Sequence, residues 1–303
     1  MAKFSASTKW PGLFASAATA AMLAFPVAAA ETAIPDFSGM WGRNAFNFEP
    51  VPGSPAPVTN LKRLPNGAGD PNALVGDYNN PILTPEAAAI VKEKGQISLT
   101  GMDFPDPSNH CAPYAPPFTF AMQLGVQVLQ AKDRITLIYN QDDQVRHVRL
   151  NASHPTRVKP SAMGDSVGHY EGDTLVVDTV GIDTLPFATI DRYGTPHSKA
   201  LHVVERYRLL DYAAATEAAE RHQKQDGPAG LGGNVTVDPD YRGKGLQLQF
   251  TVEDPKFFTM PWSANITYRR IRGAWTEQIC AENSFEYYSG KATAIPTAKK
   301  SDF

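Results

Sequence analysis

Apolar and polar residues alternate with a period of two over most of the chain after residue 120. Segments 121–129, 134–140, 144–150, 174–182, 201–210, 246–253, 264–271 and 275–282 show this alternation, which is typical of strands that pack one face on a core. Because no helix-length apolar pattern separates these segments, a parallel sheet is not expected. The pattern predicts an all-β domain, an antiparallel meander that closes as a barrel or folds as a sandwich.

The segment before these strands has a different pattern. Residues 31–83 are rich in Pro, Gly and Asn, which predicts an extended arm that wraps the domain. Thr84, Pro85 and Glu86 then provide an N-cap, a proline at the first helical position and an acid in the first turn. We expect a short helix there, which ends at Gly95.

One interruption separates the later strands. Residues 213–225 have a helical composition, and the segment 227–233 is rich in glycine, as in a flexible linker. The alanines, charges and glycines of this region offer little to a core. We therefore interpret it as a peripheral excursion between two strands, whose removal leaves the fold intact.

The first thirty residues have the features of a signal peptide. Lys3 and Lys9 precede a short apolar stretch, residues 17–27, and three alanines follow at 28–30. This order matches the basic, apolar and small-residue regions that a signal peptidase recognises. Since the apolar stretch is too short for a comfortable span of about 20 residues, we expect cleavage after Ala30 and a mature protein without a membrane span, in the periplasm or secreted.

Composition indicates which classes of partner the protein can bind and whether its cysteines are oxidised. The net charge is −3, with 42% hydrophobic and 19% charged residues, so a globular core is expected and a nucleic-acid partner is not. The sequence does not indicate an oligomeric state. An even pair of cysteines in an exported protein predicts a disulfide between Cys111 and Cys280. Neither cysteine lies in a motif that would lower its pKa, which disfavours a catalytic thiol.

Two aspartates mark the segment 174–183 as a candidate site. Asp178 lies within an apolar stretch whose two faces are both mostly apolar, and Asp183 lies where that stretch ends. We therefore expect Asp178 to be buried or at the rim of a cavity. A buried carboxylate needs a partner, either a structural one such as Arg206 or a reacting group for which it acts as base or orients an imidazole.

Histidines supply the second half of an acid–base site. His154 and His197 lie in loops, and His202 lies early in a strand. Imidazole titrates near neutral pH, so His197 or His154 beside Asp178 or Asp183 could transfer a proton. The same histidines could bind a metal, although no H-x-H, H-E-x-x-H or C-x-x-C pattern occurs, and we predict no metal site.

Further polar residues have structural alternatives. Glu205 shares an apolar strand face with Val203 and Tyr207, which favours a buried ion pair with Arg146, although these two residues and His202 could also line a substrate pocket. Ser166 lies in a G-x-S-x-G sequence, but the strand–turn–helix context of a nucleophile elbow is absent. Because no Gly-rich phosphate loop follows a strand, we predict no nucleotide or other cofactor.

Several motifs together resemble a large family of exported bacterial proteins. They are PDFSGMW, LTPEAAAIV, DPSNHCAPY, DSVGHYEGDTLVVDTVGID, GTPHSKALHVVERYR, FTVEDPKFFTMPW and ICAEN. The resemblance covers nearly the whole mature chain and implies no single activity. The usual pattern has Arg-Trp where this chain has His169-Tyr170. The family's cysteine segments match Cys111 and Cys280, and its strands are similar to those of calycin-like, lipocalin-type barrels, an analogy of fold that does not fix function.

The sequence therefore predicts a signal peptide (1–30), an extended arm with a short helix (31–100) and a lipocalin-like barrel (101–303), with one or two short helices in the whole fold. Such a barrel can hold one small ligand. The leading hypothesis is an exported enzyme for cofactor-independent elimination, hydration or isomerisation of a small apolar or aromatic molecule, with Arg146 holding a substrate anion. The alternatives are a small-molecule carrier of the same shape and a serine hydrolase that uses Ser166.

Overall fold

The computed structural model describes residues 34–43, 45–102, 104–107, 111–121, 125–141, 144–185, 187–226, 237–272, 280, 285–286 and 291–292. Its helices are α1 (Pro85–Ser98), α2 (Phe118–Ala121) and α3 (Tyr212–Asp226). Its strands are β1 (Gly39–Gly42), β2 (Glu49–Pro50), β3 (Val126–Gln130), β4 (Arg134–Tyr139), β5 (Gln144–Leu150), β6 (Asp165–Glu171), β7 (Thr174–Val180), β8 (His202–Leu210), β9 (Gly245–Glu253), β10 (Trp262–Arg270), β11 (Phe285–Glu286) and β12 (Lys291–Ala292).

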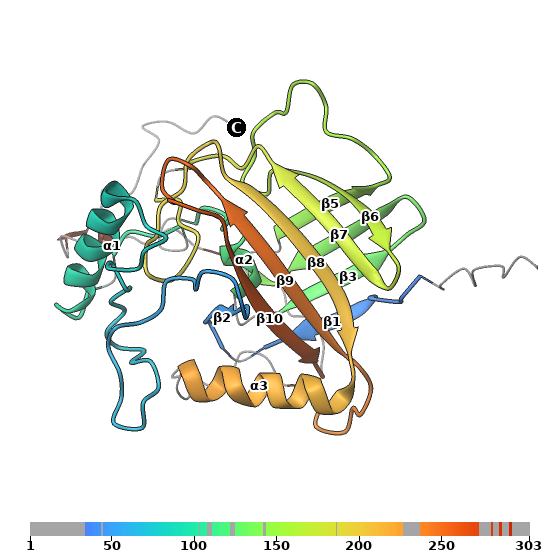
Figure 1. The fold of residues 1–303 in the computed structure, drawn as a ribbon, viewed down its shortest axis with the longest axis horizontal. Helices are drawn as coiled ribbons and strands as arrows, with labels where there is room; N and C mark the ends of the chain where they lie inside the picture. Colours follow the sequence, from blue (N-terminus) through green and yellow to red (C-terminus); the bar gives the residue numbers. More distant parts are fainter. Residues whose placement is uncertain are drawn as a thin grey trace, which may run out of the picture. The chain divides into compact units, whose positions relative to one another are not determined.

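The main sheet is a closed, lipocalin-like β-barrel (Figure 1). Its strands follow the order β1-β3-β4-β5-β6-β7-β8-β9-β10, and β1 pairs with β10 to close the sheet. Strand β2 is not part of this closed ring and pairs with β10. The predicted all-β barrel is confirmed. The prediction of a wholly antiparallel sheet is wrong at one place, because β5 and β6 are parallel. The connection 151–164 is long enough to return the chain to the starting end of β5.

The arm contributes to the barrel as well as surrounding it. Trp41 of β1 pairs with Val126 on one side and with Arg270 on the other, so the barrel cannot close without this segment. Trp41 is buried, and the guanidinium of Arg270 lies 3.9 Å from its ring centroid. Sequence patterning missed β1 because four residues are too few to show alternation.

Inward-facing side chains alternate along the strands, as a half-buried sheet requires. Those of β7, β8 and β9 include Leu175, Val177, Tyr207, Leu248 and Phe250, all buried. The cavity found between the inward-facing side chains has a volume of about 10 Å³, which is room for roughly one water molecule. The barrel interior is therefore a packed core at this level.

Helix α1 begins as predicted and ends later. The Thr84 hydroxyl accepts a hydrogen bond from the amide of Ala87, with Pro85 following it. The prediction that Gly95 ends the helix is wrong, since α1 continues to Ser98. Gly95 serves packing instead: a Cβ at this position would lie 3.0 Å from Cγ1 of Val75.

Other segment predictions differ from the structure at their ends. The expected strand at 121–129 begins only at Val126, because residues 118–121 form α2. Strand β6 was not predicted, since Gly164 and Gly168 make it resemble a loop. The expected strand at 275–282 lies outside the described residues, apart from Cys280. The disulfide prediction is confirmed: Cys111 and Cys280 are bonded, with Cα atoms 5.5 Å apart.

Helix α3 is more than a peripheral excursion. It crosses the end of the barrel beneath β9 and β10 (Figure 1), and its residues Ala215, Ala218 and His222 are buried. A Cβ on Gly245 of β9 would lie 2.3 Å from the Cβ of Ala215, so helix and sheet are in close contact. The helix therefore packs against the barrel, while its residues are not part of the main hydrophobic cluster, and the prediction that its removal leaves the fold intact stays a prediction.

Candidate functional site

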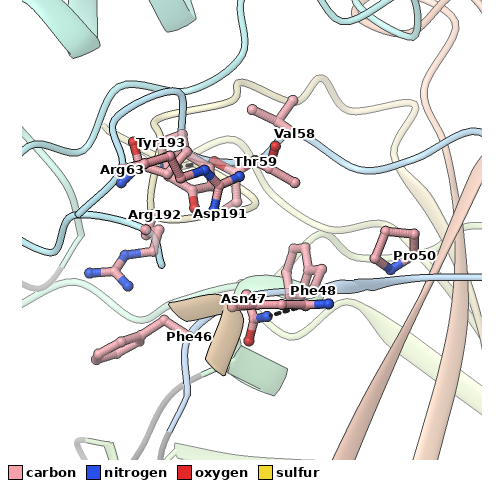
Figure 2. Close-up of a pocket in the computed structure, with 13 residues that line it drawn as sticks. Phe46, Asn47, Phe48, Pro50, Val58, Thr59, Arg63, Asp191, Arg192 and Tyr193 are labelled. Carbon is pink, nitrogen blue, oxygen red and sulfur yellow. Dashed lines mark hydrogen bonds between the residues drawn. The ribbon is translucent and has the colours of Figure 1, made fainter. Parts of the chain in front are cut away.

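A cleft outside the barrel is the candidate site (Figure 2). One wall is the arm segment that contains Phe46, Asn47, Phe48 and Pro50, and the facing wall combines a second part of the arm with a loop between β7 and β8. The cleft has a volume of about 220 Å³. The remaining lining residues are Val58, Thr59, Asn60, Arg63, Gly69, Asp191, Arg192, Tyr193 and Gln225.

Asp191 is the buried carboxylate of this cleft, and its residue is 4% exposed. Its Oδ1 accepts hydrogen bonds from the amides of Tyr193, at 2.8 Å, and Thr195, at 3.1 Å. Its carbonyl accepts a hydrogen bond from the hydroxyl of Thr189. Figure 2 shows Asp191 on the same wall as Arg63 and Tyr193, across from Phe46 and Phe48. The carboxyl group is thus fixed by its own loop.

Burial raises the pKa of Asp191 from 3.8 to about 6, although hydrogen bonds from Thr195 and Tyr193 partly oppose that effect. A carboxyl group with such a pKa exchanges protons close to neutral pH. Ionising the Asp191 carboxyl group inside the protein costs free energy. A side chain that only holds its loop in place through hydrogen bonds does not need a group with this cost. A carboxyl group in a cleft whose pKa is raised by burial is a typical feature of functional sites.

A second buried carboxylate holds the loop that carries Asp191. Asp254 accepts hydrogen bonds from both the amide and the hydroxyl of Ser198, at 2.5 and 2.8 Å. It also accepts a bond from the amide of Lys256. These bonds attach the loop to the turn after β9, so the position of Asp191 depends on the barrel scaffold.

The opposite wall is attached to helix α3. The Asn47 side chain donates to Gln225, and Arg43 donates to the carbonyl and side chain of Asn47. Glu49 bonds His222 at 2.7 Å and Arg221 at 2.6 Å. Burial alone would raise the pKa of Glu49, but these two partners outweigh it and hold the pKa at about 2. Helix α3 therefore fixes the aromatic wall of the cleft.

The cleft combines apolar surface with cationic side chains. The guanidinium of Arg192 lies 4.4 Å from the ring centroid of Phe46, and Arg63 is exposed at the edge. Aromatic rings and guanidinium groups together suit a small aromatic molecule that carries an anionic or strongly polar group.

The structure places three predicted site residues on the outer face of the barrel. Asp178 points outward with its side chain 43% exposed, so the prediction that it is buried is wrong. The reason is that its strand face is covered only in part. The Nε2 atoms of His154 and His202 each lie 3.1 Å from Oδ1 of Asp178, and Arg206, the expected partner, pairs with Glu171 instead.

The cluster on the outer face extends to three further residues. Asp165 bonds both Arg149 and the Nδ1 of His154, the latter at 2.6 Å. Glu253 lies 3.7 Å from Nδ1 of His202. Among the residues that the structure describes, no group of three or more His, Cys, Asp or Glu is arranged to hold a metal ion. The cluster is a surface charge network.

His197 and Asp183 lie elsewhere. His197 is buried, with Nδ1 3.2 Å from the carbonyl of Ser198. Burial lowers the pKa of His197, and the hydrogen bond with the Ser198 carbonyl and the charges of Asp254 and Asp183 partly oppose this effect. Asp183 is thus electrostatically close to His197, whereas Asp178 has other histidines as its partners. His197 is absent from the lining of the cleft, six positions after Asp191 on the same loop.

The remaining candidates lie inside the barrel. Arg146 makes a two-pronged ion pair with Glu205, at 2.6 and 2.9 Å, which confirms the expected pair. The pair spans the interior from β5 to β8 instead of joining neighbouring strands. Ser166 is buried and accepts a bond from Nε of Arg146, and a guanidinium cannot act as its base. Tyr207 also donates to Glu205, at 2.7 Å.

Sequence reasoning missed Asp191. It lies in the sequence ATIDRYGTPHS, where the turn residues after it suggest an aspartate that merely bonds loop amides. A carboxylate in that role is ordinarily exposed, so nothing local indicated its burial. The walls that bury it come from the arm, more than 120 residues earlier in the chain.

The fold and site together define a lipocalin-like barrel with a candidate acid–base cleft on its outside. In comparisons with known proteins, no family model, curated protein or solved structure matches the chain. Among the described residues, no helix has the length and apolar character needed to cross a membrane.

Proposed function

We propose that this protein is an exported enzyme that catalyses proton transfer on a small aromatic or largely apolar molecule bound in the Asp191 cleft. The reaction class is cofactor-independent elimination, hydration or isomerisation. The observation that supports the proposal is a carboxyl group buried in the wall of an aromatic cleft, held by two loop amides. Export is proposed from the features of residues 1–30, and a disulfide is compatible with it.

Each part of the cleft has a role in this proposal. Asp191 takes the proton from the substrate, because a carboxylate with a pKa of about 6 is ionised at neutral pH yet basic enough to accept a proton. Phe46 and Phe48 contact the apolar part of the substrate. Arg192 holds the anionic group and stabilises charge that develops during the reaction.

The test begins with a thermal-shift screen of small aromatic acids, phenols and terpenoids. A binder that is also turned over should show a rate that rises with pH through about 6 and then levels. Asp191→Asn should reduce turnover by about 10²-fold or more, with ligand binding retained. Arg192→Gln should weaken binding. Unchanged turnover in Asp191→Asn would contradict the assignment.

The carrier alternative uses the same cleft and predicts binding without turnover. The serine hydrolase alternative predicts covalent labelling of Ser166 by a fluorophosphonate. The buried position of this serine beside Arg146 offers it neither access nor a base. The serine hydrolase hypothesis is therefore less well supported than the proton-transfer enzyme or the carrier.

A further inference from the structure

A second pocket lies between helix α3 and the seam where β1 meets β10. It has a volume of about 270 Å³. Its lining residues are Gly42, Arg43, Ala45, Thr216, Ala219, Glu220, His222, Gln223, Val237, Thr267 and Arg269. Gly42 and Arg269 are paired across the seam, so the pocket floor is formed by the closure of the barrel.

Arg269 brings a buried positive charge to this pocket, and its residue is 8% exposed. Its Nη1 donates to the hydroxyl of Thr216 at 2.6 Å, and its guanidinium lies 4.7 Å from the ring centroid of Tyr212. Its guanidinium also forms a hydrogen bond with the Tyr212 side chain, whereas its Nε has no hydrogen-bond partner among the described residues. A buried donor without a hydrogen-bond partner is costly.

Thr267 is a second unsatisfied group on the same lining. It is buried, and its Oγ1 has no hydrogen-bond partner among the described residues. Thr267 and Arg269 project from the same face of β10, two positions apart. Most buried hydroxyl and guanidinium donors in proteins are bonded. Two unsatisfied donors on one pocket wall indicate that a ligand acceptor completes the site.

Arg43 and His222 add to the positive character of the pocket. Arg43 is buried and donates through Nη2 to Nδ1 of His222 at 3.0 Å. A guanidinium only donates hydrogen bonds, so Nδ1 accepts and the Nε2–H of His222 donates to Glu49. Burial lowers the pKa of His222. His222 is therefore neutral. Arg43 and Arg269 bring two positive charges to the lining, while ionised Glu49 lies on the far side of His222.

We propose that this pocket binds a small monocarboxylate with a short apolar body. The planar guanidinium of Arg269 suits a carboxylate, while Thr267 donates a further bond and Ala45, Ala219 and Val237 contact the apolar part. Glu220 is exposed and also lines the pocket, which disfavours a dianion such as phosphate. This site is separate from the Asp191 cleft and does not depend on the proposed reaction.

The experiment is an NMR titration of full-length mature protein labelled with ¹⁵N-arginine. The probe is sodium propionate, with sodium chloride at equal ionic strength as the reference and inorganic phosphate as a comparison. The Nε–Hε signal of Arg269, assigned by its loss in Arg269→Gln, should shift and saturate with propionate. Phosphate should bind more weakly. No saturable shift beyond that of chloride, or tighter binding of phosphate, would overturn the proposal.

Calorimetry of variants provides the second measurement. Arg269→Gln should raise the Kd for propionate by about tenfold or more. The matched control is Arg206→Gln, which removes an exposed arginine from the outer face of β8 and should leave the Kd unchanged. Arg192→Gln should also leave it unchanged, which separates this pocket from the cleft. Equal Kd values in Arg269→Gln and wild type would refute the site, and if Arg269→Gln does not fold, Arg269→Lys supplies both the signal assignment and the comparison of Kd values.

Discussion

Replacing Asp191 with asparagine separates a functional acid from a structural one. Both loop amides that bind the side chain donate to the same oxygen, Oδ1. An asparagine keeps that acceptor, while its NH₂ group takes the place of Oδ2. The substitution therefore removes the ability to ionise and preserves the loop geometry. We expect it to lower activity and to raise stability at neutral pH.

The magnitude follows from the pKa. The ordinary value of 3.8 rises to about 6 in the folded protein, and this difference corresponds to about 3 kcal/mol. Between these two pH values the folded state holds a proton that the unfolded state has released. Stability therefore falls as pH rises from about 4 to about 6, and the full penalty applies above pH 6. Asp191→Asn should thus be more stable than wild type at pH 7, by up to about 3 kcal/mol.

The assay is urea denaturation of both proteins between pH 4 and pH 8. The difference in unfolding free energy should be near zero at pH 4 and should reach its full value by pH 7. Asp254→Asn is the matched control. Asp254 accepts donors on both carboxylate oxygens, so an amide there should destabilise by about 1–3 kcal/mol.

One result would refute this reasoning. If Asp191→Asn is less stable than wild type at pH 7, and the loss grows with pH, then the carboxylate charge supports the loop. Asp191 would be a brace like Asp254, and the cleft would lose its acid–base group. A stable Asp191→Asn variant with full turnover would leave the stability argument intact and remove the catalytic role.

Three further outcomes are expected. Glu205→Gln should destabilise by about 3–5 kcal/mol, measured by urea denaturation, because it leaves the charge of Arg146 buried and unpaired. Replacing Cys111 and Cys280 together with serine should cost about 3–5 kcal/mol, since the disulfide closes a separation of 169 residues; an unchanged melting temperature would contradict this. Glu49→Gln should reduce the loss of stability as pH falls from about 4.5 to about 2, because the depressed pKa of Glu49 makes its contribution disappear in that window.

The sequence predicted the barrel because its evidence is local. Strands such as β8 and β9 alternate buried with less buried residues over 202–208 and 248–253, and the inward position of Glu205 follows from the same period. The closure of the barrel did not follow, because β1 is short and pairs with β10 more than 200 residues away. The parallel pairing of β5 and β6 depends on how a loop crosses the barrel end, which residue patterns do not encode.

The candidate site was harder to predict, for a related reason. Alternation correctly placed Asp178 and Thr179 on opposite faces, but both faces are apolar and the choice of the inner face depends on the whole barrel. The polar residue on the inner face is Thr179, which bonds Arg146 and Ser166. Burial of Asp191 arises from contacts between distant segments. The sequence shows that position 191 is an aspartate in a loop, but it does not show that the carboxyl group is buried.

The packing of the described part of the barrel interior changes how the carrier and enzyme hypotheses compare. A lipocalin-like carrier ordinarily holds its ligand inside the barrel, but here Arg146, Glu205 and Tyr207 form a bonded polar core, and the interior cavity found is about 10 Å³. Opening that core would leave a buried charge unpaired. A carrier that used the outer cleft would gain nothing from a carboxyl group that destabilises the fold on ionisation. The proposed enzyme, in contrast, uses that carboxyl group as its base, so turnover that depends on Asp191 distinguishes it from a carrier.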